Sequence, residues 1–217
     1  VEGYDACRKI AILSSLAFGR QVNFEDVYTE GITKISALDI CYAKKLGMTI
    51  KLLASSKKTA DGIFAMVAPV LVGAEDPLYS VNGVFNAIFI HGNMLGDAMF
   101  YGSGAGKLPT ASAVTADIVD EAKHLGESIM PSWSSEKLEL TDIGNSKKRF
   151  FVRAKGSAEE ELSKVEAVFG KVDVVTVPEA EGEFGFVTEI LSEAQYKEMS
   201  DRLDTVIGRI RIREEVC

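Results

Sequence analysis

Residues 149–175 read RFFVRAKGSAEEELSKVEAVFGKVDVV, and this stretch decides the fold of the carboxyl-terminal part of the chain. Short apolar runs bounded by turn residues predict strands, and the longer segments between them predict helices. Continued to residue 213, the pattern has the order βαββαβ, which is typical of the ferredoxin-like fold. The predicted strands are 149–154, 172–177, 184–191 and 207–212, and the predicted helices are 158–169 and 193–203.

The preceding region mixes helices and strands. Residues 2–19 contain a long uncharged run, and a helix that is apolar on every side is predicted to be buried. A second helix is predicted between Ser36, a good N-cap with Asp39 three residues later, and Gly47, a good stop. The remaining predicted elements are strands over 49–55, 63–72, 84–91 and 98–101, the third following a turn at Asn82-Gly83, and a helix over 109–125.

These patterns predict an α+β chain with two domains. Residues 1–126 form a β-sheet covered by helices, residues 127–148 form a linker, and residues 149–217 form the ferredoxin-like domain. The composition agrees, because 217 residues that are 47 % hydrophobic and 26 % charged can bury one large core or two small ones.

Charge and cysteine content exclude several classes of protein. With 24 basic and 32 acidic residues the net charge is −8, which argues against nucleic acid or an anionic membrane as partner. No apolar run approaches the roughly 20 residues of a membrane span. Three Cys without CxxC spacing predict neither a disulfide framework nor a metal site, so we expect a cytoplasmic protein. The first residue is Val and no signal peptide follows, so we expect a chain that begins inside a longer protein.

Asp5 and Lys9 are the first candidate for chemistry. They stand four residues apart and would share one face of a helix. Lys9 leads directly into the apolar run, so its stem is expected to lie against the core. Desolvation would favour the neutral amine and the carboxylate would favour the ammonium, a balance suited to proton transfer near neutral pH. The alternative is an ordinary surface salt bridge.

A glycine-rich loop is the second candidate. Residues 101–107 read YGSGAGK and stand between a predicted strand and a predicted helix, where a backbone can approach an anion closely. The spacing is neither that of a Walker loop nor that of GxGxxG. The alternative is a tight structural turn.

Other polar residues have simpler explanations. His91 and His124 are too isolated for a metal site or a Ser–His system. Glu30 could be a polar site group, whereas Asp39 is already explained as a capping residue. Lys51 is predicted to be a half-exposed strand lysine, and residues 147–149 to be a solvated linker end.

Many short segments, in order, resemble the substrate domain of homoserine dehydrogenase. The resemblance covers residues 1 to about 125, and the number and order of its segments make it specific. The segments are Glu2-Gly3-Tyr4-Asp5-Ala6, Lys9-Ile10-Ala11-Ile12-Leu13, Glu30-Gly31-Ile32, Asp39-Ile40, Tyr42-Ala43, Leu46-Gly47, Lys51-Leu52-Leu53-Ala54, Pro77-Leu78, Val81, Phe85-Asn86-Ala87, Tyr101-Gly102, Gly104-Ala105-Gly106, Pro109-Thr110-Ala111-Ser112-Ala113-Val114 and Asp117.

The resemblance implies an NAD(P)-dependent oxidoreductase that interconverts L-aspartate 4-semialdehyde and L-homoserine in threonine and methionine biosynthesis. It implies that Lys9 transfers the proton, that Asp5 helps to bind the substrate, and that Gly104, Ala105 and above all Gly106 contact the cofactor. It implies a homodimer formed through the sheet of this domain. In that family a Rossmann domain precedes this region, so we expect a fragment that is inactive without it and that leaves the choice of NAD or NADP open.

Residues 149–213 resemble an ACT domain, the regulatory module appended to many bacterial homoserine dehydrogenases, which implies feedback by an amino acid such as threonine. The Asp-x-Pro-Gly-like turn of ACT effector sites is replaced here by Lys155-Gly156-Ser157-Ala158. Effector binding and a purely structural role therefore both stay open. A non-enzymatic amino-acid sensor and a dimerisation module on the same scaffold are the alternatives for the whole chain.

Overall fold

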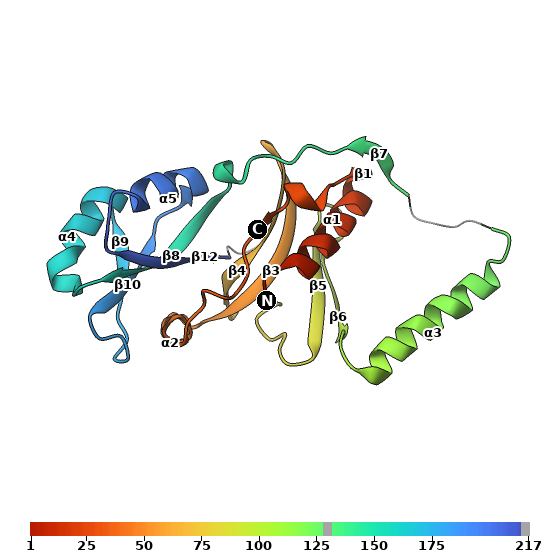
Figure 1. Cartoon of the computed structure of the whole chain (residues 1–217), viewed down its shortest axis with the longest axis horizontal. Coiled ribbons are helices and arrows are strands. Elements are labelled where there is room, and N and C mark those ends of the chain that lie inside the picture. The colour runs from red at the N-terminus through yellow and green to blue at the C-terminus, as the bar shows by residue number, and fades with distance from the viewer. Residues whose placement is uncertain (128–131, 214–217) are drawn as a thin grey trace. The chain divides into compact units, whose positions relative to one another are not determined.

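The structure, a computed structural model, describes residues 1–127 and 132–213 (Figure 1). Contacts divide the chain into two compact units, each described by itself below. The sheet unit comprises residues 1–73 and 133–213, and the hairpin unit comprises the described residues from 74 to 132. This division differs from the predicted boundaries, because the carboxyl-terminal βαββαβ segment shares one unit with the first 73 residues.

The first helix, α1 (Tyr4–Phe18), lies between two glycines with positive φ. Gly3 precedes it at φ 84°, and Gly19 follows at φ 71° and donates its N–H to the Ser15 carbonyl at 2.9 Å. Glycine suits both positions because it has no Cβ to clash in the left-handed region. The helix buries one face, which consists of Cys7, Ile10, Ala11, Ser14 and Ser15.

The prediction that α1 is buried on every side was wrong. Ile12, Leu13 and Leu16 are 52 %, 37 % and 40 % exposed. The buried face packs on the sheet together with Val22, Val27 and other apolar residues. Within the sheet unit, α1 therefore buries only one of its faces, although its opposite face is apolar as well.

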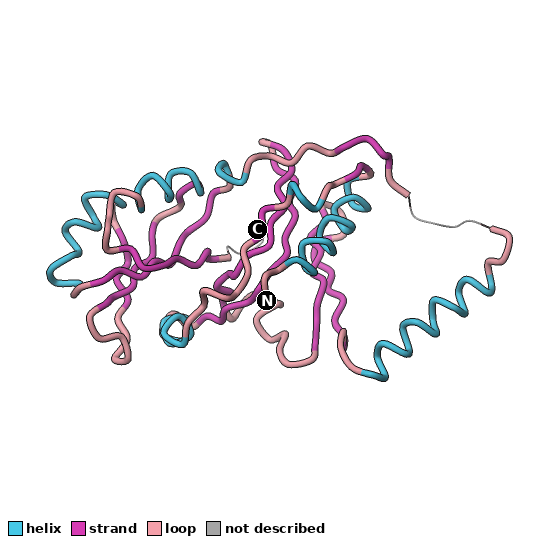
Figure 2. The backbone as a smooth tube through the Cα atoms, in the orientation of Figure 1, coloured by secondary structure: helices cyan, strands magenta, loops and turns pink. Residues whose placement is uncertain are grey.

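β4 (Gly62–Gly73) is a strand of the sheet unit that is paired along both of its edges. Figure 2 shows the course of the backbone with its strands and helices. β3 (Met48–Thr59) runs antiparallel along the whole of one edge. β2 (Tyr28–Thr29) and β12 (Val206–Ile212) pair in parallel with successive parts of the other edge.

 Residues 65–72 of β4 are all buried, Pro69 included. Because consecutive side chains of a strand point to opposite faces, this run is covered on both faces of the sheet.

The predicted βαββαβ order is confirmed. The eight-stranded sheet has the order β2-β4-β12-β8-β10-β9, with β3 beside β4 and β11 beside β8. The three pairs within the last four strands, β12-β8-β10-β9, are all antiparallel, which is the ferredoxin-like arrangement. The elements are β8 (Lys147–Lys155), α4 (Ala158–Phe169), β9 (Val172–Val175), β10 (Glu183–Thr188), β11 (Leu191–Ser192), α5 (Glu193–Ser200) and β12 (Val206–Ile212).

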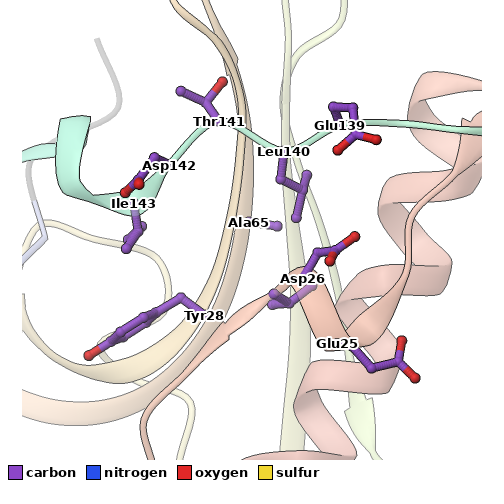
Figure 3. Close-up of a pocket in the computed structure, with 10 residues that line it drawn as sticks. Glu25, Asp26, Tyr28, Ala65, Glu139, Leu140, Thr141, Asp142 and Ile143 are labelled. Carbon is purple, nitrogen blue, oxygen red and sulfur yellow. The ribbon is translucent and has the colours of Figure 1, made fainter.

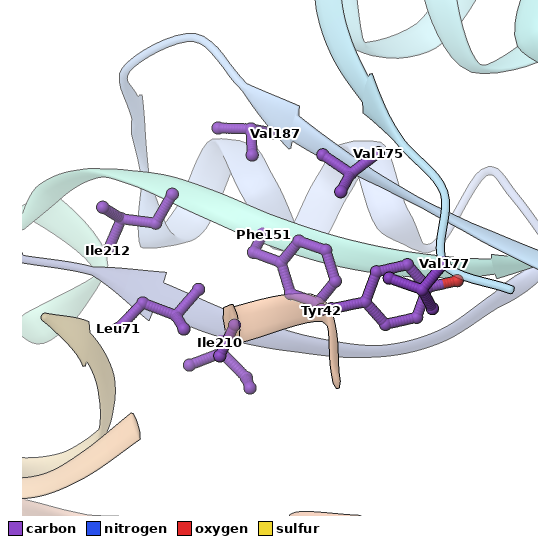
Figure 4. Close-up of a cluster of buried hydrophobic side chains, with 9 residues drawn as sticks. Tyr42, Leu71, Phe151, Val175, Val177, Val187, Ile210 and Ile212 are labelled. Carbon is purple, nitrogen blue, oxygen red and sulfur yellow. The ribbon is translucent and has the colours of Figure 1, made fainter. Parts of the chain in front are cut away.

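Alternate residues of β8 supply two different cores, because successive side chains of a strand point to opposite faces. Phe150 and Val152 pack with residues of α4, including Phe169. Phe151, on the opposite face, lies 5.1 Å from the ring of Tyr42 in the first part of the chain, centroid to centroid (Figure 4). This second core joins the βαββαβ segment to β4 and to the second helix, α2 (Ala37–Lys45).

The second helix lies where the sequence predicts it, between Ser36 and Gly47. α2 (Ala37–Lys45) has Ser36 as N-cap, and the side chains of Ser36 and Asp39 form a capping box. Strands β3 and β4 are also where the apolar pattern predicts them, although β3 extends to Thr59.

The predicted linker is not a loose connection where the structure describes it. Within residues 132–148, β7 (Ser134–Lys137) pairs in parallel with β1 (Arg20–Gln21). The indole N–H of Trp133 donates to the Gln21 side-chain oxygen at 2.7 Å, and Leu138 is buried. The serine and proline residues predict a linker, but a strand needs only a partner edge, which β1 supplies. The short helices η1 (Phe24–Asp26) and η2 (Ile143–Asn145) complete the sheet unit.

The hairpin unit consists of β5 (Phe85–Gly92), β6 (Gly96–Ser103) and α3 (Lys107–Lys123). The two strands pair antiparallel from Phe85 opposite Ser103 to Gly92 opposite Gly96. The predicted turn before β5 is confirmed, since the N–H of Phe85 donates to the Asn82 carbonyl at 3.3 Å. Within the described residues 74–127, no residue is buried.

The α+β class is thus confirmed, with helices and a mixed sheet in one chain. None of the helices that the structure describes is long and apolar enough to cross a membrane.

Candidate functional site

Asp5 and Lys9 lie on the first turns of α1 and contact each other. The Lys9 ammonium is 2.8 Å from the Asp5 carboxylate, and the side chains are 69 % and 83 % exposed. The expectation that the stem of Lys9 packs against the core was wrong, because position 9 lies on the outer face of the helix. The pair is therefore open to solvent, and a substrate can reach both groups.

The residues just before α1 are held by the segment that follows β2. The N–H of Ile32 donates to the Val1 carbonyl at 2.9 Å. A Cβ at Gly31 would collide with the same carbonyl oxygen, and a Cβ at Gly3 would lie 3.1 Å from a methyl carbon of Thr29. Only glycine at position 31 permits this close approach of two backbones. The start of the site helix is thereby fixed to the sheet.

Glu30 lies at the centre of that segment and belongs to a partly buried charge network. Its carboxylate accepts hydrogen bonds from Arg211 at 2.7 Å and from the Tyr28 hydroxyl at 3.0 Å, with a longer one from Arg209 at 3.3 Å. Burial by itself would raise the pKa of Glu30, but the hydrogen bond from Arg211 and the two arginine charges hold that pKa below its usual value.

Arg211 joins Glu30 to α5. Its side chain is 1 % exposed and makes a bidentate pair with the carboxylate of Glu193, the first residue of the helix. The guanidinium also lies 5.0 Å from the centroid of the Tyr28 ring. Two guanidinium groups and two carboxylates thus share one cluster, in which Arg211 and Glu193 are buried, Glu30 and Arg209 are partly buried, and each charge has a partner.

Arg153 forms a second network of the same kind. It makes a bidentate pair with Glu183, at 2.8 and 2.7 Å, and a hydrogen bond with Asp39 at 3.0 Å. The side chain of Ser36 accepts another at 2.8 Å. Asp39 is therefore more than a capping residue, because it also fixes α2 to β8. Burial and the neighbouring Glu183 raise the pKa of Tyr42 to about 12.

The sequence interpretation missed both arginine networks. A signal was present, because Arg153, Arg209 and Arg211 interrupt strand patterns that are otherwise apolar. A charge at such a position is buried only when a partner is supplied, and in each network one of the partners is remote in sequence. Glu30 and Arg211, for example, are 181 positions apart.

The glycine loop lies in the hairpin unit, and Asp5 and Lys9 lie in the sheet unit. Gly106 is the N-cap of α3, with φ 120° and no side-chain cap, so the backbone N–H groups of the first turn have no side-chain acceptor there. A Cβ at Gly104 would collide with the Asn86 side chain. Close packing against Asn86 within the hairpin unit therefore explains the glycine at position 104. The uncapped backbone at Gly106, in contrast, suits an anionic ligand.

The remaining predicted positions are consistent with structural roles. His91 lies across the hairpin from Asp97, with Nδ1 2.6 Å from the carboxylate, and His124 lies close to the end of α3. Burial lowers the pKa of Lys51, which is half-buried in β3. Across the described residues, no group of three or more His, Cys, Asp or Glu side chains could hold a metal ion.

A pocket of about 440 Å³ lies in the sheet unit, between η1 and the segment that leads to η2 (Figure 3). Four of its ten lining residues are acidic, among them Asp26 and Glu139, and hydrogen bonds to these two raise the pKa of Lys137. Lys9 and Asp5 do not line it. The pocket is therefore separate from the predicted site.

The geometry defines a class: an α+β protein with an exposed lysine–carboxylate pair at the start of a helix seated on a mixed sheet. The family model for homoserine dehydrogenase matches residues 1–119, and the chain belongs to the homoserine dehydrogenase family.

Individual relatives agree with this assignment. The chain is 50 % identical over 123 residues to a homoserine dehydrogenase of Neisseria gonorrhoeae, covering 57 % of this chain and 28 % of that protein. It is 43 % identical over 182 residues to one of Mycobacterium leprae, covering 80 % and 41 %. The chain thus spans well under half the length of these relatives.

Solved structures extend the likeness to nearly the whole chain. A crystal structure of a homoserine dehydrogenase from Thiobacillus denitrificans superposes with a TM-score of 0.84 at 28 % identity, covering 99 % of this chain and 54 % of that one. A homoserine dehydrogenase of S. aureus gives 0.76 at 29 % identity, with the same coverage. The βαββαβ segment is therefore included in the likeness, although the family model ends at residue 119.

Proposed function

We propose that this chain supplies the proton-transfer site of an NAD(P)-dependent homoserine dehydrogenase, which interconverts L-aspartate 4-semialdehyde and L-homoserine. The observation that carries the proposal is the Asp5–Lys9 contact of 2.8 Å on α1, within the segment that matches the family. The exposed position of both side chains supports it, because a proton donor must reach the oxygen of a substrate.

In the direction of reduction, the aldehyde carbon gains a hydride and its oxygen gains a proton. When bound, the reduced nicotinamide supplies the hydride. Lys9 donates the proton from its ammonium group to the carbonyl oxygen as the hydroxyl forms. Asp5 orients the ammonium and stabilises its charge before transfer. In the reverse direction Lys9 accepts the proton of the homoserine hydroxyl.

Gly104, Ala105 and Gly106 are proposed to contact the cofactor. The absence of a side chain and of a side-chain cap at Gly106 supports this role, because free backbone N–H groups can approach a ligand there. Since the chain spans 28 % of the N. gonorrhoeae relative, we propose that turnover needs a dinucleotide-binding domain in addition to the residues described.

The test uses a chimera in which the amino-terminal part of the N. gonorrhoeae relative precedes this chain. Lys9→Ala is expected to lower kcat about 10²–10⁴-fold, the usual cost of losing a general acid. Lys44→Ala, which removes an exposed lysine from α2, is the matched control and should leave kcat unchanged. Activity of Lys9→Ala within a few-fold of the parent chimera would refute the role of Lys9.

We also propose that the protein is a homodimer and that residues 149–213 are an ACT-like regulatory module in a cytoplasmic enzyme. The exposed apolar side chains of the hairpin unit support the dimer. The free thiols of Cys7 and Cys41 suit a reducing compartment such as the cytoplasm.

The strand order β12-β8-β10-β9 supports the regulatory module. Calorimetric titration with threonine distinguishes an effector site, which releases or absorbs heat on binding, from a structural module, which gives a flat trace.

A further inference from the structure

We infer that Glu30 and Arg211 are positioning residues, which connect the βαββαβ segment to the first turn of the site helix. The inference rests on the proposed function, since it assigns to these residues the placement of Asp5 and Lys9. Neither residue contacts the pair directly. The connection runs through the backbone of residues 29–32 and residues 1–3.

The first step is the contact between these two backbone segments. The N–H of Ile32 donates to the Val1 carbonyl at 2.9 Å, and Gly31 lies so close to that oxygen that no side chain fits between them. The first hydrogen bond of α1 then runs from the N–H of Cys7 to the Gly3 carbonyl, at 2.8 Å. A shift of residues 29–32 would therefore move the beginning of α1.

The second step is what holds residues 29–32. The N–H of Glu30 donates to the Val67 carbonyl at 2.8 Å, directly after β2 ends. β12 pairs with the same edge of β4 a little further on, where Arg211 stands opposite Val70. The gap between the two short pairings is bridged by the side chains, because Arg211 reaches the Glu30 carboxylate at 2.7 Å.

The third step is the link to α5. Arg211 binds the Glu193 carboxylate with two of its nitrogens and Glu30 with a third, so one buried guanidinium holds both acids. Glu193 begins α5, and its side chain is 9 % exposed. A movement of α5 relative to β12 would disturb the Arg211 geometry and hence the position of Glu30. A ligand that moves α5 would therefore change the position of Lys9 through Arg211 and Glu30.

Arg153 provides a matched control for a merely structural role. It too is a nearly buried arginine of the βαββαβ segment with two carboxylate partners, but these are Asp39 and Glu183. Its network touches α2 and not residues 29–32. Loss of either arginine should lower overall stability, whereas only loss of Arg211 should loosen the start of α1.

Native-state hydrogen exchange on the chain itself is the first test. In Arg211→Met, the amides of Ile32 and Cys7 are expected to exchange at least about 10-fold faster than in Arg153→Met, compared at equal global stability by adjusting denaturant. Glu30→Gln removes the charge, keeps the side-chain volume and leaves the Arg211–Glu193 pair intact, so it serves if Arg211→Met fails to fold. Equal exchange of these amides in the Arg153 variant and in the Glu30 or Arg211 variants would overturn the inference.

Kinetics of the chimera provide the second test. Glu30→Gln is expected to lower kcat about 10-fold or more with KM changed less than about 3-fold, because displacement of a catalytic group by 1 Å can cost about 10²-fold. Arg153→Met should leave kcat near the parent value. If Lys9→Ala kept full activity, the proposed function would fail. If Lys9→Ala were inactive while Glu30→Gln matched Arg153→Met, only the positioning role would fail.

Discussion

The sheet unit and the hairpin unit are both rich in apolar residues, yet they bury them very differently. The sheet unit contains four clusters of buried side chains and one strand, β4, that is covered on both faces. In the hairpin unit, within residues 74–127, large apolar side chains such as Ile88 and Phe100 remain 46 % and 65 % exposed. Apolar composition therefore does not by itself produce a core, because each face of a strand or helix needs a second layer to cover it.

The largest expected difference concerns matched phenylalanines. Phe151→Ala should lower the free energy of unfolding by about 3–5 kcal/mol, because it removes a fully buried ring from the core shared by α2 and the βαββαβ segment. Phe100→Ala should change the unfolding free energy of the monomer by less than about 0.5 kcal/mol. Urea unfolding at low protein concentration measures both. A similar loss of unfolding free energy in the two variants would contradict the difference in burial between the sheet unit and the hairpin unit.

The second prediction concerns alkaline pH. Burial raises the pKa of Tyr42 and of Tyr196 to about 12, against an ordinary value of 10. Because the folded-state pKa is the higher one, the stabilisation is complete below pH 10 and is lost as the pH rises from 10 to 12. Tyrosinate absorbance should show these two rings ionising with unfolding. Tyr42→Phe and Tyr196→Phe should each reduce this pH dependence, and an unchanged dependence in both would contradict the assignment.

The third prediction concerns the proposed dimer. Ile88→Lys should raise the dimer dissociation constant by about 10-fold or more, because a charge in a covered apolar surface must be desolvated. The unfolding midpoint of the monomer should hardly change. Analytical ultracentrifugation over a range of concentrations measures the effect, with Glu198→Lys on α5 as the control. A dimer as tight as that of the parent would place the interface elsewhere.

The smallest expected effect concerns helix ends. Ser192→Ala removes the capping box of α5 and should lower the free energy of unfolding by about 1 kcal/mol. α3 in the hairpin unit has no side-chain cap, so Gly106→Ser tests the opposite case. At φ 120° a serine would be strained, and we expect local fraying of α3 in circular dichroism with no gain in stability. A gain in helicity would show that the first turn accepts a cap.

Local signals in the sequence predict most elements of the fold. The capping box at Ser36, the turn at Asn82 and the βαββαβ order depend on residues close together in the chain, and the structure confirms them. The exposure of Ile12 and the pairing of β7 with β1 depend on what lies across space, and the sequence pattern was misleading there.

The same distinction applies to the candidate site. The Asp5–Lys9 contact follows from a spacing of four residues on a helix, and its geometry was predictable. Its exposure was not, because that depends on which face of α1 meets the sheet. Each arginine network also joins positions more than 100 residues apart, Arg153 to Asp39 and Arg211 to Glu30, and no local pattern can pair these.

The parallel pairing of β7 with β1 has a consequence for chain connectivity. β7 returns the chain to the sheet unit at a strand that directly follows α1, so the hairpin unit is topologically an insertion with both ends anchored. Loop-closure entropy grows only with the logarithm of length, and each doubling of a loop costs about 0.6 kcal/mol. An insertion of this kind can therefore lengthen, shorten or acquire new surfaces at little cost to the folding of its host.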